Sequence, residues 1–268
     1  MCAADSVVLR ARAVVPSGSE YRTRVSTESN LAIDKVVPTF GEAVSDIPDG
    51  ASIMIDGFAG PGGTPQNLIR ALRDHGARDL TIISNTAGLA SVIGFGTIPG
   101  DRPLDMGILV DNEQVRGVVA SFPVSPSPSR PTSYERAYKE GKVELELVPQ
   151  GTLAERIRAG GAGIPAFYTP TGVGTQLGDG KETRIFDGRP YIMEYALTAD
   201  FALLRGHRAD TLGNVVYRGT SQNFNSVMAM AARTTVVEVD AIVEPGGLDA
   251  EAVHTPAIYI TRIVQIAD

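Results

Sequence analysis

The feature that most constrains the fold is a strand, a glycine-rich stretch, a helix and a second strand that follow one another within residues 52–83. Residues 52–55 are an apolar run suited to a buried strand. An amphipathic segment follows and stops before Gly76, a residue typical of the end of a helix. Residues 80–83 are the next apolar run. Because strands joined through a helix run in the same direction, this βαβ unit predicts a parallel sheet.

The ends of two helices are marked by polar residues. Thr64 is expected to be the N-cap of the helix in the βαβ unit, with Pro65 at its first helical position. Thr39, followed three residues later by Glu42, predicts a capping box at the start of a short earlier helix. Both helices therefore have starting points that the sequence alone predicts.

The alternation of strands and helices continues to the C-terminus. Further strands are predicted over residues 117–120, 143–148, 201–204, 214–217 and 236–239, further helices over residues 134–138, 151–159 and 224–232, and a hairpin around the Asp187-Gly188 turn. Long loops are expected over residues 94–102 and over the Pro/Ser-rich residues 123–131. The pattern is that of one mixed α/β domain.

Residues 1–33 differ from the rest of the chain. They mix arginines with serine and threonine and show no sustained period, so a disordered N-terminal extension is expected, with the domain over residues 34–268. The apolar run at residues 7–9 is interrupted by Arg10 and Arg12, which argues against a secretory signal. No stretch approaches the length of a membrane span, so a cytoplasmic protein is expected.

Composition argues against several classes of function. Asp and Glu number 31 against 24 for Lys and Arg, so the net charge is −7 and the chain lacks the positive field that nucleic acids or anionic membranes require. The single cysteine, Cys2, and three widely separated histidines predict no disulfide framework and no metal site. Glu144 and Glu146 alternate with apolar residues and are expected on a solvated strand face.

The glycine-rich stretch between the first strand and its helix is a candidate ligand site. A helix N-terminus offers free N–H groups and the positive end of the helix dipole, which suit a phosphate or pyrophosphate. The stretch is neither a Walker A loop nor a G-x-G-x-x-G fingerprint in register. A purely structural turn is the more frequent reading of such a pattern.

Two amide side chains follow other strands of the predicted sheet. Asn85 comes just after residues 80–83, and Gln150 comes after residues 143–148. The carboxyl ends of parallel strands line the ligand crevice of an open sheet, and an amide there can donate to a carboxylate or an oxyanion. Turn formation and helix capping are the alternative roles for these two residues.

Five stretches together resemble one known family. They are "IPDGASIMIDGFAGPGGTPQNLIRAL", "DLTIISNTAG", "VELELVPQGTLAERIRAGGAGIPAFYTPTGVGT", "ADTLGNVVYRGTSQNFNSVMAMAARTTVVEV" and "HTPAIYITRIV". Their content and order resemble the A (alpha) subunits of the family I CoA-transferases, the group of succinyl-CoA:3-oxoacid CoA-transferase.

The resemblance implies an open, mostly parallel sheet with flanking helices, the CoA-transferase or NagB-like fold. It also implies a homologous B subunit, in a heterodimer or an α₂β₂ heterotetramer, and coenzyme A as a co-substrate with no permanently bound cofactor. The family reaction is ping-pong through a glutamyl-CoA thioester. The nucleophilic glutamate belongs to a Glu-Asn-Gly motif of the B subunit, and this chain contains no such tripeptide.

The resemblance assigns roles to particular residues. Asn85 and Gln150 match the family amides that face the reacting glutamate and the acid substrate, so both are expected to orient the substrate carboxylate and hold the oxyanion. The family's CoA-binding segment corresponds to Gly57, Phe58, Ala59, Gly60, Pro61, Gly62 and Gly63.

The chain departs from the family pattern at several positions. Asp56 stands where glycine is usual, the glycine-rich stretch has one extra residue, and Thr86 replaces a second asparagine of many members. The loops over residues 94–102 and 123–131 are longer than usual, so the acid substrate need not be acetoacetate. Transferases for acetate or butyrate or for 3-oxoadipate share the same stretches. Two alternatives to a transferase subunit belong to another class of function. The chain could be the partner of an acyl-CoA lyase or hydrolase, or a non-catalytic scaffold protein.

Overall fold

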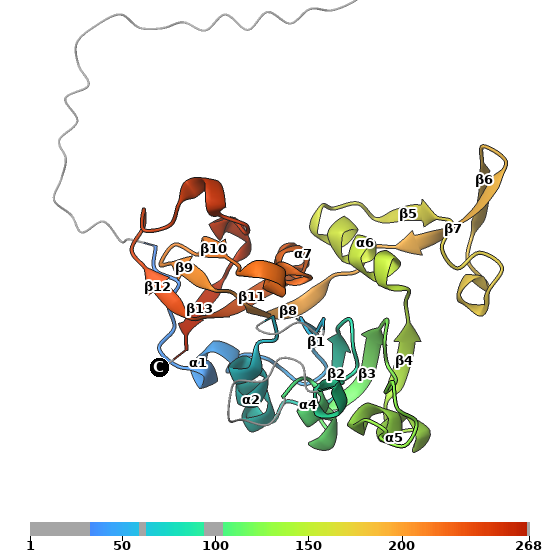
Figure 1. Ribbon diagram of the computed structural model, residues 1–268, viewed down its shortest axis with the longest axis horizontal. Coiled ribbons are helices and arrows are strands. Elements are labelled where there is room, and N and C mark those ends of the chain that lie inside the picture. Colours follow the sequence, from blue (N-terminus) through green and yellow to red (C-terminus); the bar gives the residue numbers. More distant parts are fainter. Residues whose placement is uncertain (1–32, 59–62, 94–103, 267–268) are drawn as a thin grey trace, which may run out of the picture. The chain divides into compact units, whose positions relative to one another are not determined.

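A seven-stranded sheet forms the centre of the computed structural model, which describes residues 33–58, 63–93 and 104–266 (Figure 1). The strand order is β13-β11-β8-β1-β2-β3-β4, and every pairing within this sheet is parallel. Its strands are β1 (Ser52–Ile55), β2 (Leu80–Ile83), β3 (Val115–Ala120), β4 (Glu144–Leu147), β8 (Ala199–Arg205), β11 (Ala232–Val239) and β13 (Arg262–Gln265). The fold class expected from the sequence, an open and mostly parallel sheet with flanking helices, is confirmed.

Helices cover both faces of this sheet. They are α1 (Phe40–Val44), α2 (Gln66–His75), α3 (Ala90–Ile93), α4 (Gly107–Asp111), α5 (Ser133–Lys139), α6 (Gln150–Gly161) and α7 (Asn225–Ala231). Residues of α1, α2, α4 and α5 share one buried apolar cluster with the sheet, while α6 and α7 share a second cluster on the other face (Figure 1). Strand β1 shows the alternation directly, since Ile53 and Ile55 belong to the first cluster and Met54 to the second.

Helix α2 begins differently from the sequence prediction. Its N-cap is Pro65 and not Thr64, and no side chain of its own segment caps it. The N–H group of Leu68 donates instead to the carboxylate of Glu238 in β11, at 2.9 Å. A group 170 positions away thus satisfies the helix end that Thr64 was expected to satisfy. The predicted end is confirmed, because Gly76 adopts φ +83° and donates to the carbonyl of Leu72.

Two smaller sheets flank the main one. The first, in the order β5-β7-β6, is antiparallel and comprises β5 (Ala166–Thr169), β6 (Thr183–Phe186) and β7 (Arg189–Tyr195). The predicted hairpin joins β6 to β7 through Asp187 and Gly188, both with positive φ, as a two-residue hairpin turn requires. The second sheet, in the order β10-β9-β12, comprises β9 (Arg208–Asp210), β10 (Val215–Val216) and β12 (Ala241–Val243).

Short 3₁₀ turns complete the connections: η1 (Gln176–Gly178), η2 (Gly219–Gln222), η3 (Ala250–Ala252) and η4 (Ala257–Tyr259). The described residues from Ile33 onward form one compact unit. The expected extension at residues 1–33 falls outside the described residues except for Ile33, and the expected loop at residues 94–102 lies wholly outside them. Within the described ranges, no helix is long and apolar enough to cross a membrane.

Candidate active site

The candidate site lies at the carboxyl edge of the main sheet. Strands β1, β2 and β3 are neighbours and parallel, so the segments that follow them meet at one edge (Figure 1). These segments carry Asp56 and Gly57 after β1, Asn85 after β2 and Ser121 after β3. The placement of Asn85 at this edge agrees with the expectation from the sequence.

Asn85 is almost completely buried, with 2% of its surface exposed. Its backbone carbonyl accepts hydrogen bonds from the N–H groups of Ser121 and Phe122, at 3.1 and 2.9 Å, which fixes the residue against β3. Its side-chain Oδ1 is buried and has no hydrogen-bond partner among the described residues, as is also true of Ser84 Oγ and Ser121 Oγ. Buried polar atoms are rarely left unpaired, so this group of them marks the edge as a candidate ligand site.

Gln150 is the first residue of α6 and lines a pocket of about 250 Å³. The other lining residues come from the glycine-rich stretch, from α6, from the segment that leads into α7 and from α7 itself: Phe58, Ala154, Asn223, Phe224 and Val227. The rings of Phe58 and Phe224 lie 6.0 Å apart between their centroids. We refer to this cavity as the aromatic pocket, after these two rings. The amides of Gln150 and Asn223 are the polar side chains among its lining residues.

The structure thus brings Gln150 and Phe58 together in one cavity. Asn85 does not line the aromatic pocket, and β3 lies between the strands that precede the two amides. The glycine-rich stretch nevertheless contacts the segment of Asn85, since Thr86 Oγ1 donates to the carbonyl of Gly57 at 2.9 Å. A Cβ atom on Gly57 would lie 3.0 Å from Ser84 Oγ, which explains a glycine at this close approach.

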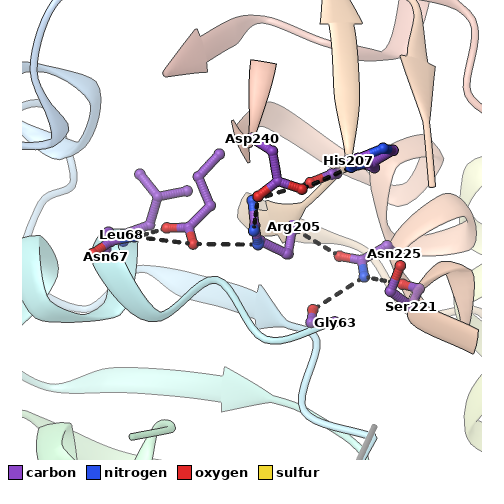
Figure 2. A network of polar contacts seen from close by, with 10 residues as sticks. Gly63, Asn67, Leu68, Arg205, His207, Ser221, Asn225 and Asp240 are labelled. Atoms are coloured by element: carbon purple, nitrogen blue, oxygen red, sulfur yellow. Dashed lines mark hydrogen bonds and ion pairs between the residues drawn. The ribbon is translucent and has the colours of Figure 1, made fainter. Parts of the chain in front are cut away.

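The far end of the glycine-rich stretch is held by Asn225, the first residue of α7 (Figure 2). Its Nδ2 donates to the carbonyls of Gly63 and Ser221, at 3.1 and 2.8 Å, and its Oδ1 accepts from the N–H of Arg205 at 3.0 Å. Ala59, Gly60, Pro61 and Gly62, the middle of the expected CoA-binding segment, lie outside the described residues.

The N-terminus of α2 is already occupied by a protein carboxylate. Glu238, 1% exposed, accepts from Leu68 N–H, and its Oε1 lies 3.8 Å from Nε of Arg205. Arg205 also pairs with Asp240, which contacts His207 Nδ1 at 2.7 Å (Figure 2). A ligand phosphate at this helix end would therefore have to displace Glu238.

Burial also changes the acidity of two carboxyl groups next to the site. Desolvation raises the pKa of Glu238 to about 7, although the Leu68 N–H group and the charge of Arg205 oppose the rise. Desolvation likewise raises the pKa of Asp56 to about 8. Perturbed acid groups of this kind concentrate at functional sites and in buried ion networks.

Sequence reasoning did not single out Asn225, Glu238 or Phe224, the aromatic neighbour of Phe58. The signal for Glu238 was its place as a charged residue within an apolar strand, where a carboxylate must find buried partners. The other expectation, that Glu144 and Glu146 lie on a solvated strand face, is confirmed, because both are exposed on the edge strand β4. Glu146 also pairs with Arg156 at 2.5 Å. In the described part of the chain, no three His, Cys, Asp or Glu residues are grouped as a metal site would require.

Comparison with known proteins identifies the family. The family model described as coenzyme A transferase matches residues 37–265, so the chain belongs to the coenzyme A transferase family and the expected enzyme class is confirmed. The chain is 49% identical over 218 residues to the A subunit of the succinyl-CoA:3-ketoacid coenzyme A transferase of Xanthomonas campestris pv. campestris (strain B100), with 81% of this chain and 83% of that one covered. It is 46% identical over 235 residues to the A subunit of the 3-oxoadipate CoA-transferase of Pseudomonas putida, covering 88% and 95% respectively.

A solved structure shows the same fold. The apoenzyme of the acyl-CoA transferase YdiF from Escherichia coli O157:H7 superposes with a TM-score of 0.73 at 23% identity. The match covers 88% of this chain and 48% of that one. This chain therefore corresponds in fold to about half of that longer protein.

Proposed function

We propose that the chain is the A subunit of a heteromeric CoA-transferase that moves CoA between succinyl-CoA and a 3-oxoacid such as acetoacetate. The name of the Xanthomonas relative supports this substrate pair. The observation that carries the proposal is the aromatic pocket, where Gln150 faces apolar side chains and no described lining residue is a carboxylate. The nucleophilic glutamate is therefore assigned to a B subunit with a Glu-Asn-Gly motif, which this sequence lacks.

The reaction proceeds by covalent exchange at that glutamate. Its carboxylate attacks the thioester carbonyl, and the CoA thiolate leaves as an acyl-glutamyl anhydride forms. The thiolate then attacks the glutamyl carbonyl, which yields a glutamyl-CoA thioester and releases the first acid. The acceptor carboxylate takes up CoA by the reverse steps. Each attack develops negative charge on a carbonyl oxygen, and amide N–H groups of Asn85 and Gln150 are assigned to stabilise that charge.

The glycine-rich stretch is assigned to the acyl end of CoA rather than to its phosphates. Phe58 lines the same pocket as Gln150, whereas the first turn of α2 is engaged by Glu238. Of the residues expected to contact CoA, Gly57, Phe58 and Gly63 are within the described ranges, and Phe58 lines the aromatic pocket. The glycine-rich stretch is thus proposed to contact CoA at its acyl end, whereas the sequence pattern alone suited a phosphate.

The complex is proposed to be a cytoplasmic heterodimer or α₂β₂ heterotetramer, in which the B subunit covers the carboxyl edge of the sheet. Phe122 and Val124, which follow β3, are 49% and 58% exposed, so apolar surface remains for such a partner.

Alanine variants of the two amides test the assignment. In the assembled complex, Asn85→Ala and Gln150→Ala are expected to lower turnover by ~10²–10³-fold, the usual effect of removing an oxyanion donor. Gln176→Ala is the matched control, because Gln176 is an exposed amide in η1, outside the residues that line the aromatic pocket. Wild-type turnover in both site variants would refute the roles assigned to Asn85 and Gln150.

A second candidate acceptor is 3-oxoadipate, because the Pseudomonas relative carries that substrate in its name. Comparing kcat/KM for acetoacetate and 3-oxoadipate, with succinyl-CoA as the donor, distinguishes the two. Hydrolysis or cleavage of the acyl-CoA without transfer would favour the lyase or hydrolase alternative.

A further inference from the structure

Asp56 is a completely buried carboxyl group at the end of the central strand β1. Along β1, Met54 packs with the cluster of α6 and α7, so the alternation of side chains directs Asp56 towards that same face. Its Oδ1 accepts from the N–H of Phe58 at 3.1 Å. Its Oδ2 is buried and has no partner among the described residues.

The groups around Asp56 belong to two segments that form the aromatic pocket. The N–H group of Phe58 in the glycine-rich stretch donates to it, and the backbone N–H groups of Asn225, Gly57 and Phe224 oppose the rise of its pKa. Phe58 and Phe224 are the two aromatic walls of the pocket. A single side chain therefore accepts a hydrogen bond from Phe58 and lies within the electrostatic influence of the backbone at the start of α7.

Among the described residues, no ion pair joins Asp56 to a lysine, arginine or histidine. Tyr217, in the segment after β10, is close enough that the charge of Asp56 contributes to the raised pKa of that tyrosine. An ionised carboxylate buried without a cation is costly, whereas a protonated one carries no charge and its carbonyl oxygen still accepts from the N–H of Phe58. Burial accordingly raises the pKa of Asp56 to about 8.

We propose that Asp56 is a positioning residue which, as a neutral carboxyl group, fixes Phe58 and the start of α7 and thereby sets the shape of the pocket that binds the acid substrate. This inference rests on the proposed transferase function. Ionisation of Asp56 at alkaline pH places an unpaired negative charge next to Phe58 and the start of α7, which weakens binding of the acid.

Two variants of Asp56 and one control test the proposal in the assembled complex. Asp56→Asn keeps the shape and is neutral at every pH, so it is expected to retain the wild-type KM for the acid at neutral pH. The wild-type KM for the acid should rise above pH about 8, and this rise should be absent in Asp56→Asn. Asp56→Ala should raise that KM roughly five- to tenfold at every pH, as expected for a lost hydrogen bond. Asp74→Asn, on the exposed surface of α2, should behave as wild type.

A second measurement needs no activity. The difference in Tm between full-length Asp56→Asn and wild type should grow as pH rises from about 4 to about 8, because in this range Asp56 ionises in the unfolded wild-type chain while the folded chain still holds its proton. A Tm difference that stays constant with pH, or an Asp56→Asn complex that keeps the alkaline rise in KM, would overturn the proposal. A wild-type complex that transfers no CoA would instead refute the proposed function, while the Tm series would still report the ionisation of Asp56.

Discussion

Replacing Asn225 with alanine tests how firmly the glycine-rich stretch is tied to the far side of the sheet. Asn225 is completely buried and makes three hydrogen bonds, to Gly63, Ser221 and Arg205 (Figure 2). The variant leaves two carbonyls and one N–H group without their partner. At about 1 kcal/mol for each buried group, the free energy of unfolding should fall by roughly 3 kcal/mol. For a domain of this size that corresponds to a Tm lower by roughly 6–12 °C.

The assay is urea denaturation of the full-length chain, followed by circular dichroism, with the slope against denaturant compared between variants. Thr220→Ala is the control, because Thr220 lies in the same segment but is exposed, and surface changes usually stay within about 0.5 kcal/mol. Asn225→Asp should be at least as harmful as alanine, since it removes both donors and adds a negative charge beside buried Asp56. A loss below about 1 kcal/mol for Asn225→Ala would refute the reasoning.

Two further predictions concern a buried charge and a close helix contact. Because burial raises the pKa of Glu238 to about 7, the wild type loses stability as pH rises from the unfolded value towards 7, and Glu238→Gln should gain stability relative to wild type over that range. Denaturation midpoints of wild type and Glu238→Gln, measured at pH about 5 and about 8, test this prediction. A difference between the two midpoints that is the same at both pH values would contradict it. In α6, a Cβ atom on Gly160 would lie 2.3 Å from the carbonyl oxygen of Leu197, so Gly160→Ala should lower Tm through about 1–3 kcal/mol of overpacking. Gly151→Ala in the same helix meets nothing within 4 Å and should not lower Tm.

The elements that the sequence predicted are those with local causes. The strands of the βαβ unit follow from apolar runs, the end of α2 from Gly76, and the hairpin from Asp187 and Gly188. Each of these features depends on residues within one turn or one strand. The edge position of Asn85 was also predictable, because it requires only that successive parallel strands end on the same side.

The start of α2 and the composition of the aromatic pocket depend on distant residues. Glu238 reaches the first turn of α2 because β11 lies beside β8, and β8 beside β1, an order that no local pattern specifies. Phe224 joins Phe58 and Gln150 for the same reason, since α7 packs against α6 on the second face of the sheet. Sequence reasoning identified two members of the pocket, Phe58 and Gln150, while their neighbours required the three-dimensional fold.

The most direct test of the proposed function is CoA transfer from succinyl-CoA to acetoacetate, followed by the absorbance of the acetoacetyl-CoA enolate. The full-length chain is assayed alone and after mixing with a B subunit that carries Glu-Asn-Gly. We predict no transfer by the chain alone and transfer by the mixture, lost when the glutamate of the B subunit is replaced by glutamine. Transfer by this chain alone would contradict the placement of the nucleophile on a second polypeptide.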